Sequence, residues 1–305
     1  MNPIHPAPPA SPRPSLPGVL AGLRILSLAL NLPGPAALMR AQAMGARCLK
    51  LEPPGGDPMQ AYSPEAYSQL HQGMEVERID LKSSPGQARL AQALSDTDVV
   101  LTSFRPSALA RLGLDWPTLH ARYPALSLVA IVGDPEAPEV PGHDLTYQAE
   151  HDLVTGLSLP PTLYADMGGA LQASEALLQA ALLRQAGQPG RRFDVGLAGA
   201  AAFLALPRRW GLTQATGLIG GAHAGYQVYA CQDGRVAVAA LEPHFMQRLC
   251  DAAGLPAQSS PTAADTQAAA ARWFLTLTRA ELDALARALD LPLHTLPDTG
   301  TSGRR

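Results

Sequence analysis

The stretch RILSLALNLPGPAALMRAQAMGARCLKLE, residues 24–52, decides the fold. It begins with a short apolar run, 24–30, that is typical of a buried strand, and a Pro-Gly-Pro loop follows at 33–35. A helical pattern then runs over 36–44, and a second strand-like run covers 47–52. Strand, loop, helix and strand in this order predict a βαβ unit with parallel strands.

The alternation of strand-like and helix-like segments continues to about residue 205. The expected strands lie at 76–81, 98–101, 126–132 and 193–197, and the expected helices at 86–94, 107–112, 116–123, 167–186 and 198–205. This α/β order predicts an open parallel sheet in a large domain that spans 19–215.

The pattern of the sequence changes after Gly217, and this change predicts a second domain. Two runs of alternating residues are joined by a turn that contains glycine, which is typical of a β-hairpin. The expected hairpin covers 226–230 and 235–240, and expected helices follow over 243–253 and 263–289. We therefore predict a smaller α+β domain over 216–297.

The two ends of the chain differ in composition from the rest. The first residues are rich in proline and lack the apolar core of a signal peptide, so we predict a disordered arm over 1–18. The segment 298–305 is predicted to be a disordered tail.

Composition and charge exclude several function classes. The formal net charge of -3 offers no basic patch for nucleic acid or for a membrane surface, and no apolar stretch is long enough to cross a bilayer. The 3 cysteines lack a CxxC spacing, and the 8 histidines are scattered, so we expect a reducing compartment and no metal site. These features favour a cytoplasmic protein.

Three loops are expected at the carboxyl ends of the parallel strands, where open α/β sheets bind ligands. They cover 31–35, 102–106 and 133–170, and the last of them carries the most reactive side chains. No GxGxxG motif follows the first strand, so we do not expect a nicotinamide dinucleotide.

Asp166 is expected at or near the N-cap of the long helix that starts at about 167. Aspartate is a preferred N-cap, so a purely structural role is one reading of this residue. Gly168 and Gly169 favour a functional reading, because glycines in a first turn let a ligand carbonyl approach backbone N–H groups at the positive end of the helix dipole.

Two further side chains carry weaker signals. His143 follows Gly142, and a lone histidine beside glycine is more often a loop residue than a catalyst. Glu242 precedes the predicted helix at 243–253, where a carboxylate is common without any catalytic role. From the residues alone, both remain open.

The order of these segments resembles the class III CoA-transferase (CaiB/BaiF) family over roughly 19–250. The segments that carry the resemblance are 20–28, 33–35, 44–57, 79–82, 104–106, 111–114, 142–144, 165–169, and 226–245 with its central Gly234. This resemblance implies a Rossmann-like large domain, a smaller α+β domain and two interlocked subunits, hence a homodimer.

The same resemblance implies an acyl-CoA thioester substrate, with coenzyme A as part of the substrate and no covalently bound cofactor. In the racemase branch of the family, the residues that match His143 and Asp166 act as a pair of bases, and Glu242 belongs to the site. In the transferase branch, the aspartate that matches Asp166 is a nucleophile. The expected coenzyme A contacts are Leu32, Pro33, Ser103, Phe104, Arg105, Arg111, Gly168 and Gly169.

The sequence departs from the family pattern in three places. The segment 71–75 reads His-Gln-Gly-Met-Glu where the family usually carries an Asn-Arg-Gly-Lys-Arg-like run, and Ser107 stands where the usual motif has glycine. The family also normally continues past the segment that matches 293–297. Three hypotheses follow: an α-methylacyl-CoA racemase-like isomerase, a CoA-transferase, and a homologue that binds acyl-CoA without turnover.

Overall fold

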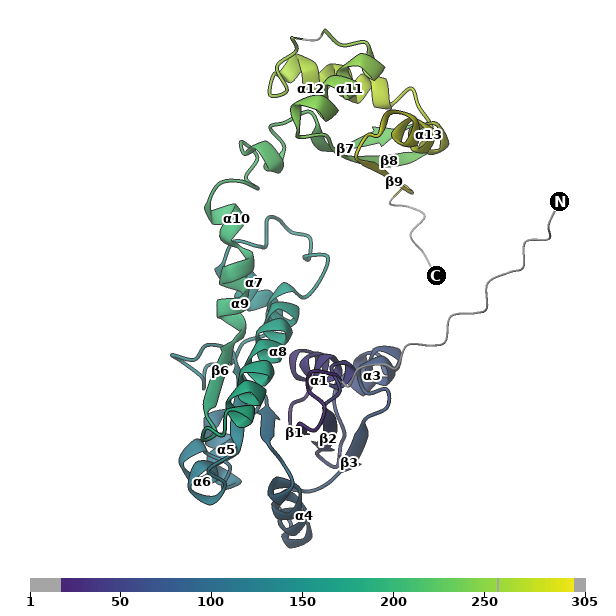
Figure 1. The fold of residues 1–305 in the computed structure, drawn as a ribbon. Coiled ribbons are helices and arrows are strands. Elements are labelled where there is room, and N and C mark those ends of the chain that lie inside the picture. The colour runs from purple at the N-terminus through teal and green to yellow at the C-terminus, as the bar shows by residue number, and fades with distance from the viewer. Residues whose placement is uncertain (1–17, 257, 299–305) are drawn as a thin grey trace, which may run out of the picture. The chain divides into compact units, whose positions relative to one another are not determined.

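A computed structural model describes residues 18–256 and 258–298 of the chain. The described residues divide into two compact units, one that ends at Leu204 and one that begins at Ala205 (Figure 1). Nearly all of the predicted arm and tail lies outside the described residues. The predicted domain boundaries stay a prediction.

The first unit is built on a six-stranded parallel sheet with the order β3-β2-β1-β4-β5-β6. Its strands are β1 (Arg24–Ser27), β2 (Arg47–Glu52), β3 (Glu75–Arg78), β4 (Val99–Thr102), β5 (Ser127–Val132) and β6 (Arg192–Gly196). This is the strand order of a Rossmann-like fold, so the predicted fold class is confirmed.

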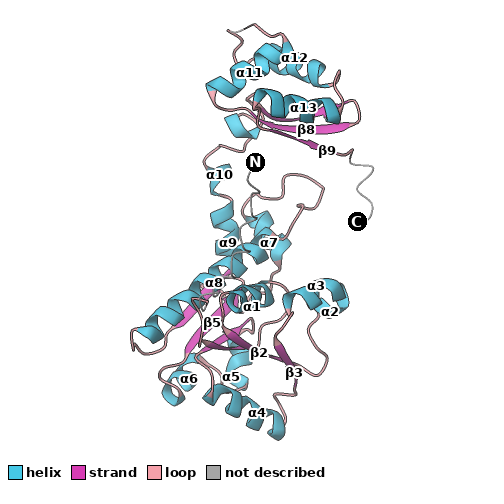
Figure 2. Ribbon diagram, turned by 45° about the vertical axis from the view of Figure 1, so that its right-hand side comes forward, coloured by secondary structure: helices cyan, strands magenta, loops and turns pink. Residues whose placement is uncertain are grey.

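Helices cover both faces of this sheet, as Figure 2 shows. Alternate residues of each strand point to opposite faces, so Ile25 packs against α1 (Pro33–Ala43) and α8 (Tyr164–Gln185), while Leu26 packs on the other face. The helices on that other face are α4 (Ser84–Ser95), α5 (Pro106–Arg111) and α6 (Trp116–Arg122). Strands buried on both sides explain the continuous apolar runs in the sequence.

The point where the strand order reverses lies between β1 and β4. From β1 the chain continues to β2 on one side, and from β4 it continues to β5 on the other side. The loops that leave these strands therefore diverge and open a crevice at the carboxyl edge of the sheet.

The start of α1 differs from the sequence-based expectation for a physical reason. The first strand ends at Ser27 because Ser27 Oγ accepts the Ala29 N–H at 3.2 Å, in place of a neighbouring strand. The helix begins at Pro33, three residues earlier than expected. Proline suits a first helical position because it has no N–H group to leave unpaired.

Six short elements of the described chain were not expected from the sequence. They are α2 (Met59–Tyr62), α3 (Pro64–Leu70), α7 (Asp144–Glu150), α10 (Leu206–Arg209), the 3-10 turn (Leu218–Gly220) and β9 (Leu293–Leu296). Each has at most seven residues, which is too few for an apolar period to stand out. In the first unit, α9 (Leu197–Leu204) follows β6 as predicted within one residue.

The second unit is a three-stranded antiparallel sheet with helices on one face. The predicted hairpin forms β7 (Tyr226–Cys231) and β8 (Gly234–Ala239), and β9 pairs with β8. The helices are α10 (Leu206–Arg209), α11 (Pro243–Ala253), α12 (Ala264–Phe274) and α13 (Arg279–Leu289), with a 3-10 turn over Leu218–Gly220. The expected long helical segment over 263–289 is thus two helices, the second capped by Thr278.

Two expectations from composition concern the state of the cysteines and the lack of a membrane-spanning segment. Cys231 and Cys250 are free thiols buried in the core of the second unit, where they pack as small apolar groups. Within the part of the chain that the structure describes, no helix combines the length and apolarity that a membrane span requires.

Candidate active site

A cavity of about 170 Å³ lies at the carboxyl edge of the six-stranded sheet. Its walls come from the loops after β1, β4 and β5 and from the first residues of α7 and α8. The side chains with reactive or polar groups that line it are Asn31, Ser103, Arg105, His143, Tyr147 and Asp166.

Asp166 is the third residue of α8, whose N-cap position is occupied by Leu163. The capping role considered for Asp166 is therefore wrong, and its carboxyl group is available to the cavity. Burial raises the pKa of Asp166 to about 6, and the negative charge of Asp144 adds to this rise. A carboxyl group with such a pKa is a competent proton acceptor near neutral pH.

Asp144 connects the two helices that carry the candidate catalytic residues. Its side chain is buried, and its Oδ1 accepts the backbone N–H of Asp166 at 3.0 Å. Its Oδ2 accepts a hydrogen bond from Gln148 Nε2, and that amide also donates to Thr162 O at 3.3 Å. The first turn of α8 is thus held against α7 by a carboxylate that also perturbs Asp166.

His143 is the N-cap residue of α7, directly before Asp144. Its backbone N–H donates to Thr146 Oγ1 at 3.1 Å, and Thr146 Oγ1 donates to His143 O at 2.7 Å. These bonds hold the backbone and leave the imidazole as part of the cavity wall. The structure therefore brings His143 and Asp166 to one cavity, from the first turns of consecutive helices.

Tyr147 is a wall residue that the sequence analysis did not find. Its hydroxyl lies against Gly133 and Gly142, where an added Cβ would come within 2.2 Å and 2.4 Å of the oxygen. Only glycine leaves room for this ring at the two positions. The two glycines were a usable signal, but the bulky residue they accommodate is not adjacent in sequence.

Three of the residues expected to contact coenzyme A line the cavity, namely Pro33, Ser103 and Arg105. Ser103 Oγ accepts the N–H of Leu30 at 3.0 Å, which joins the β1 loop to the β4 loop. The other expected contacts from these loops, Leu32, Phe104 and Arg111, are not among the wall residues. Their roles in binding coenzyme A stay predictions.

Gly168 and Gly169 are explained by helix packing. An added Cβ at Gly169 would lie 2.3 Å from Leu197 Cδ2, and one at Gly168 would lie 3.2 Å from Ala200 Cβ. Both glycines therefore let α9 approach α8 closely, which is a structural reason that the sequence analysis did not consider. Their proposed contact with a ligand stays a prediction.

Glu242 belongs to the second unit, where it is the N-cap residue of α11. Its carbonyl oxygen accepts the Met246 N–H at 3.0 Å, as expected at a helix start. The second unit has a larger cavity, of about 690 Å³, beside β7 and β8. The described residues that line this second cavity include Tyr226 and His294 but no carboxylate, lysine or arginine, so a histidine paired with a carboxyl group is found at the smaller one.

Comparison with protein-family models matches residues 20–300 to the model described as CoA-transferase family III. A Chloroflexus aurantiacus succinyl-CoA–D-citramalate CoA-transferase is 35% identical over 132 residues, which cover 41% of this chain and 32% of that relative. Human alpha-methylacyl-CoA racemase is 26% identical over 261 residues, which cover 79% of this chain and 66% of that relative. This chain thus covers about a third of one relative and about two thirds of the other.

Solved structures share the fold. The structure of a hypothetical protein, Rv3272, from Mycobacterium tuberculosis superposes with a TM-score of 0.78 at 23% identity. The superposition covers 91% of this chain and 84% of that chain. At this identity the likeness concerns the fold alone.

Proposed function

The chain belongs to CoA-transferase family III, and from this premise we propose that it is an enzyme that acts on coenzyme A thioesters. The specific activity that we propose is epimerisation of a 2-methylacyl-CoA by 1,1-proton transfer, like that of an α-methylacyl-CoA racemase. The observation that carries this choice is the presence of His143 and Asp166 on the wall of one cavity.

Inversion at the α-carbon requires two groups that handle protons. One group removes the α-proton on one face of the carbon, and the other group delivers a proton to the opposite face. The raised pKa of Asp166, about 6, suits both the acceptance and the return of a proton near neutral pH. The imidazole of His143 is the natural partner because it lies on the same cavity wall and one of its ring nitrogens can accept a proton while the other donates.

The enolate of the thioester is the high-energy species between the two proton transfers. Its negative charge is stabilised by positive or donor groups, and the first turn of a long helix presents such a partial positive charge. Asp166 stands in the first turn of α8, and Arg105 contributes a cation to the same wall. This placement supports a proton transfer beside the thioester carbonyl.

A CoA-transferase mechanism is the second candidate, because curated relatives with that activity include the one that is 35% identical. In this mechanism the Asp166 carboxylate attacks the thioester carbonyl, which expels the coenzyme A thiolate and leaves a mixed anhydride. Attack of the thiolate on the aspartyl carbonyl then releases the acyl group as a carboxylate and leaves an aspartyl-CoA thioester. The acceptor carboxylate takes up the coenzyme A through the reverse of these steps.

Deuterium incorporation tests the first candidate. The purified protein is incubated with a 2-methylacyl-CoA in D2O, and the mass of the thioester is followed with wild type, His143→Ala and Asp166→Ala. Epimerisation predicts that the wild type exchanges the α-proton of both enantiomers, and that each variant loses exchange with the enantiomer whose α-proton faces the deleted base. Glu242→Gln is included because the racemase branch also implies a role for Glu242.

Other outcomes separate the alternatives. Transfer of coenzyme A to an added carboxylic acid, retained in His143→Ala and lost in Asp166→Ala, supports the transferase mechanism and overturns the first proposal. Binding of acyl-CoA with neither exchange nor transfer supports the hypothesis of a homologue without turnover.

Three further proposals concern context. From the family resemblance we propose that the protein forms a homodimer and takes an acyl-CoA thioester as its substrate, and from its composition and cysteine spacing we propose that it works in the cytoplasm. Sedimentation of the purified chain tests the first of these, since a dimer has twice the 32.0 kDa mass of the chain.

A further inference from the structure

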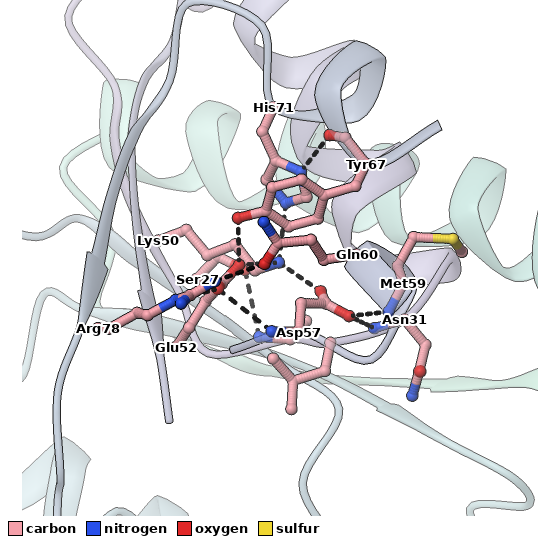
Figure 3. Close-up of polar contacts among 12 residues, drawn as sticks. Ser27, Asn31, Lys50, Glu52, Asp57, Met59, Gln60, Tyr67, His71 and Arg78 are labelled. Carbon is pink, nitrogen blue, oxygen red and sulfur yellow. Dashed lines mark hydrogen bonds and ion pairs between the residues drawn. The ribbon is translucent and has the colours of Figure 1, made fainter. Parts of the chain in front are cut away.

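A buried ion cluster lies next to the candidate active site, and the proposed chemistry does not use it (Figure 3). Its centre is Lys50 on β2, whose side chain is fully buried. The Nζ atom lies 2.5 Å from Asp57 Oδ2, 3.0 Å from Glu52 Oε1 and 2.8 Å from His71 Nε2. Asp57 and His71 are hydrogen-bond partners of this ammonium group, and Glu52 forms an ion pair with it.

The protonation state of His71 follows from its two contacts. Its Nε2 faces the Lys50 ammonium and must accept, so its Nδ1 carries the hydrogen and donates to Tyr67 O at 2.7 Å. Burial lowers the pKa of His71, and the positive charge of Lys50 lowers it further. The histidine is therefore a neutral acceptor in this cluster.

Oxygen and nitrogen atoms of Glu52, Asp57 and His71 lie within 4.8 Å of one another, a spacing that would suit a metal ion. The Lys50 ammonium lies within hydrogen-bond distance of all three of these residues. A cation that is part of the chain thus takes the place that a bound metal would take, and its charge compensates the buried carboxylates.

One member of the cluster reaches the active-site loop. Asp57 Oδ1 accepts the backbone N–H of Asn31 at 3.0 Å and that of Met59 at 2.9 Å. Asn31 has a φ of +64°, a left-handed conformation that asparagine adopts more readily than most non-glycine residues. It lines the same cavity as Asp166, so the carboxylate fixes the backbone of a turn residue at the candidate site.

We propose that Asp57 and Lys50 are positioning residues for the loop 30–33 of the substrate cavity. Lys50 engages one carboxylate oxygen of Asp57, which directs the other oxygen at the Asn31 N–H. The loop is held on its other side by the bond from Leu30 N–H to Ser103 Oγ. Neither positioning residue is among the wall residues of the cavity, so each acts through the loop.

This proposal rests on the proposed function for its ligand, a coenzyme A thioester. The prediction is that loosening the loop weakens binding of the thioester without removing the catalytic groups. Preorganised loops bind better because less conformational freedom is lost when the ligand arrives.

Amide hydrogen exchange measures the loop directly, with no ligand present. Mass spectrometry follows the peptide that covers 28–35, and the central strand segment 127–132 serves as an internal reference. We expect Asp57→Ala to raise exchange in 28–35 about tenfold or more and to leave 127–132 protected, because local opening is then independent of global unfolding.

Tyr67→Phe is the matched control. Tyr67 donates its hydroxyl hydrogen to Glu52 Oε1 at 3.0 Å and so belongs to the same cluster, but it makes none of the contacts that Asp57 makes with the loop. Exchange in 28–35 is expected to stay within about twofold of the wild type in this variant. Asp57→Asn is the milder second variant, because its single oxygen can serve either Lys50 or the loop.

Calorimetric titration with acetyl-CoA measures how the same variants affect binding of the thioester. We expect Asp57→Ala to weaken binding about tenfold and Tyr67→Phe to leave it within about twofold, in line with the loss of preorganisation. Unchanged exchange in 28–35 of folded Asp57→Ala, or of folded Asp57→Asn if the alanine variant does not fold, overturns the proposal. So does faster exchange with unchanged acetyl-CoA affinity.

A failure of the proposed function can be distinguished from a failure of the positioning proposal. If wild type does not bind acetyl-CoA, the proposed ligand is wrong, while the exchange comparison between Asp57→Ala and Tyr67→Phe still decides whether the cluster holds the loop.

Discussion

Two acidic pairs in the first unit differ in what surrounds them. Asp144 and Asp166 are close in space, and the described contacts of Asp144 are a backbone N–H and a neutral amide. Glu52 and Asp57 are also neighbours, but the Lys50 ammonium lies between them. Burial, with the negative charge of Asp144 added, raises the pKa of Asp166, whereas Lys50 compensates the carboxylates of the second pair.

The difference shows how one fold produces both a reactive and an inert carboxylate. Burial penalises the charged form of a carboxyl group unless a cation or several donors compensate it. At Asp166 the compensation is incomplete, which leaves a group that can accept a proton. At Asp57 the acceptor atoms are occupied by Lys50 and by two backbone N–H groups, which leaves a structural anchor.

Removal of the cation should have the largest effect on stability. Lys50→Met leaves Asp57 without its counter-charge and leaves Glu52 with the half-exposed Arg78 at 3.8 Å, and we expect a loss of about 3–5 kcal/mol in the free energy of unfolding. Urea denaturation at pH 7 measures it. A loss below about 1 kcal/mol would contradict the view that the ammonium compensates the cluster.

Removal of the uncompensated charge of Asp166 should raise the free energy of unfolding, whereas removal of the Lys50 cation lowers it. Asp166→Asn is expected to stabilise the protein at pH 7 by about 1–2 kcal/mol, with a loss of activity. The folded-state pKa of about 6 lies above the ordinary value of 3.8. The protonated form therefore adds stability below about pH 4, and this contribution is lost as the pH rises to about 6 and beyond.

The test is a pair of denaturation curves for wild type and Asp166→Asn at pH 4 and pH 7. The two proteins should differ at pH 7 and converge at pH 4, where the wild-type carboxyl group is protonated. A variant that is destabilised at pH 7 would show that the ionised Asp166 is compensated after all.

Neutralising the neighbour should shift the pH profile of any activity that uses Asp166 as a base. Asp144→Asn keeps an oxygen for the Asp166 N–H but removes the negative charge that raises the pKa of Asp166. The acid limb of kcat/KM, expected near pH 6 in the wild type, should move down by up to about 1 pH unit.

The side chain of Gln148 can accommodate asparagine in place of Asp144. Its buried Oε1 has no hydrogen-bond partner among the described residues, so rotation of this amide offers an acceptor to the introduced asparagine side chain, with loss of the 3.3 Å bond from Nε2 to Thr162 O. The pH profile of Asp144→Asn should therefore be measured beside its stability. An unchanged acid limb in a stable variant would mean that burial alone sets the pKa of Asp166.

The smallest effect on stability is expected for Tyr67, which contacts Glu52 of the compensated pair. Tyr67→Phe removes one hydrogen bond to Glu52, and we expect a loss of about 0.5–1.5 kcal/mol in the free energy of unfolding. Urea denaturation in parallel with Lys50→Met measures this loss. A loss as large as that of Lys50→Met would mean that the hydroxyl, and not the cation, is the main support of Glu52.

Much of the architecture follows from local sequence patterns. The apolar runs at 24–30, 47–52 and 126–132 predict buried strands because a strand covered on both faces needs apolar residues at successive positions. The hairpin at 226–239 was predicted from its alternation and its glycine turn, and the structure confirms it. Short elements such as α7 and β9 lacked a readable period.

The candidate site was predicted only in part, and this prediction rested mainly on the family resemblance and not on local sequence patterns. His143 and Asp166 were named through the resemblance and the loop position. The one local signal beside Asp166, the glycines at 168 and 169, has a structural explanation in the packing of α9 on α8. Asp144 was quoted in a motif without a role. Its effect on Asp166 depends on a contact across 22 residues, which no sequence period encodes.

The sequence by itself thus determined the class of fold, the order of the elements, the family resemblance and the loops that could hold chemistry, because periodicity and turn residues act over short distances. Tertiary structure alone decided which carboxylates are compensated. Lys50 on β2 meets His71 because α3, which ends just before His71, packs against α1, and Asp166 meets Asp144 through the packing of α7 on α8. The pKa of a buried group depends on such three-dimensional neighbours, so the distinction between anchor and reactive group appears only after folding.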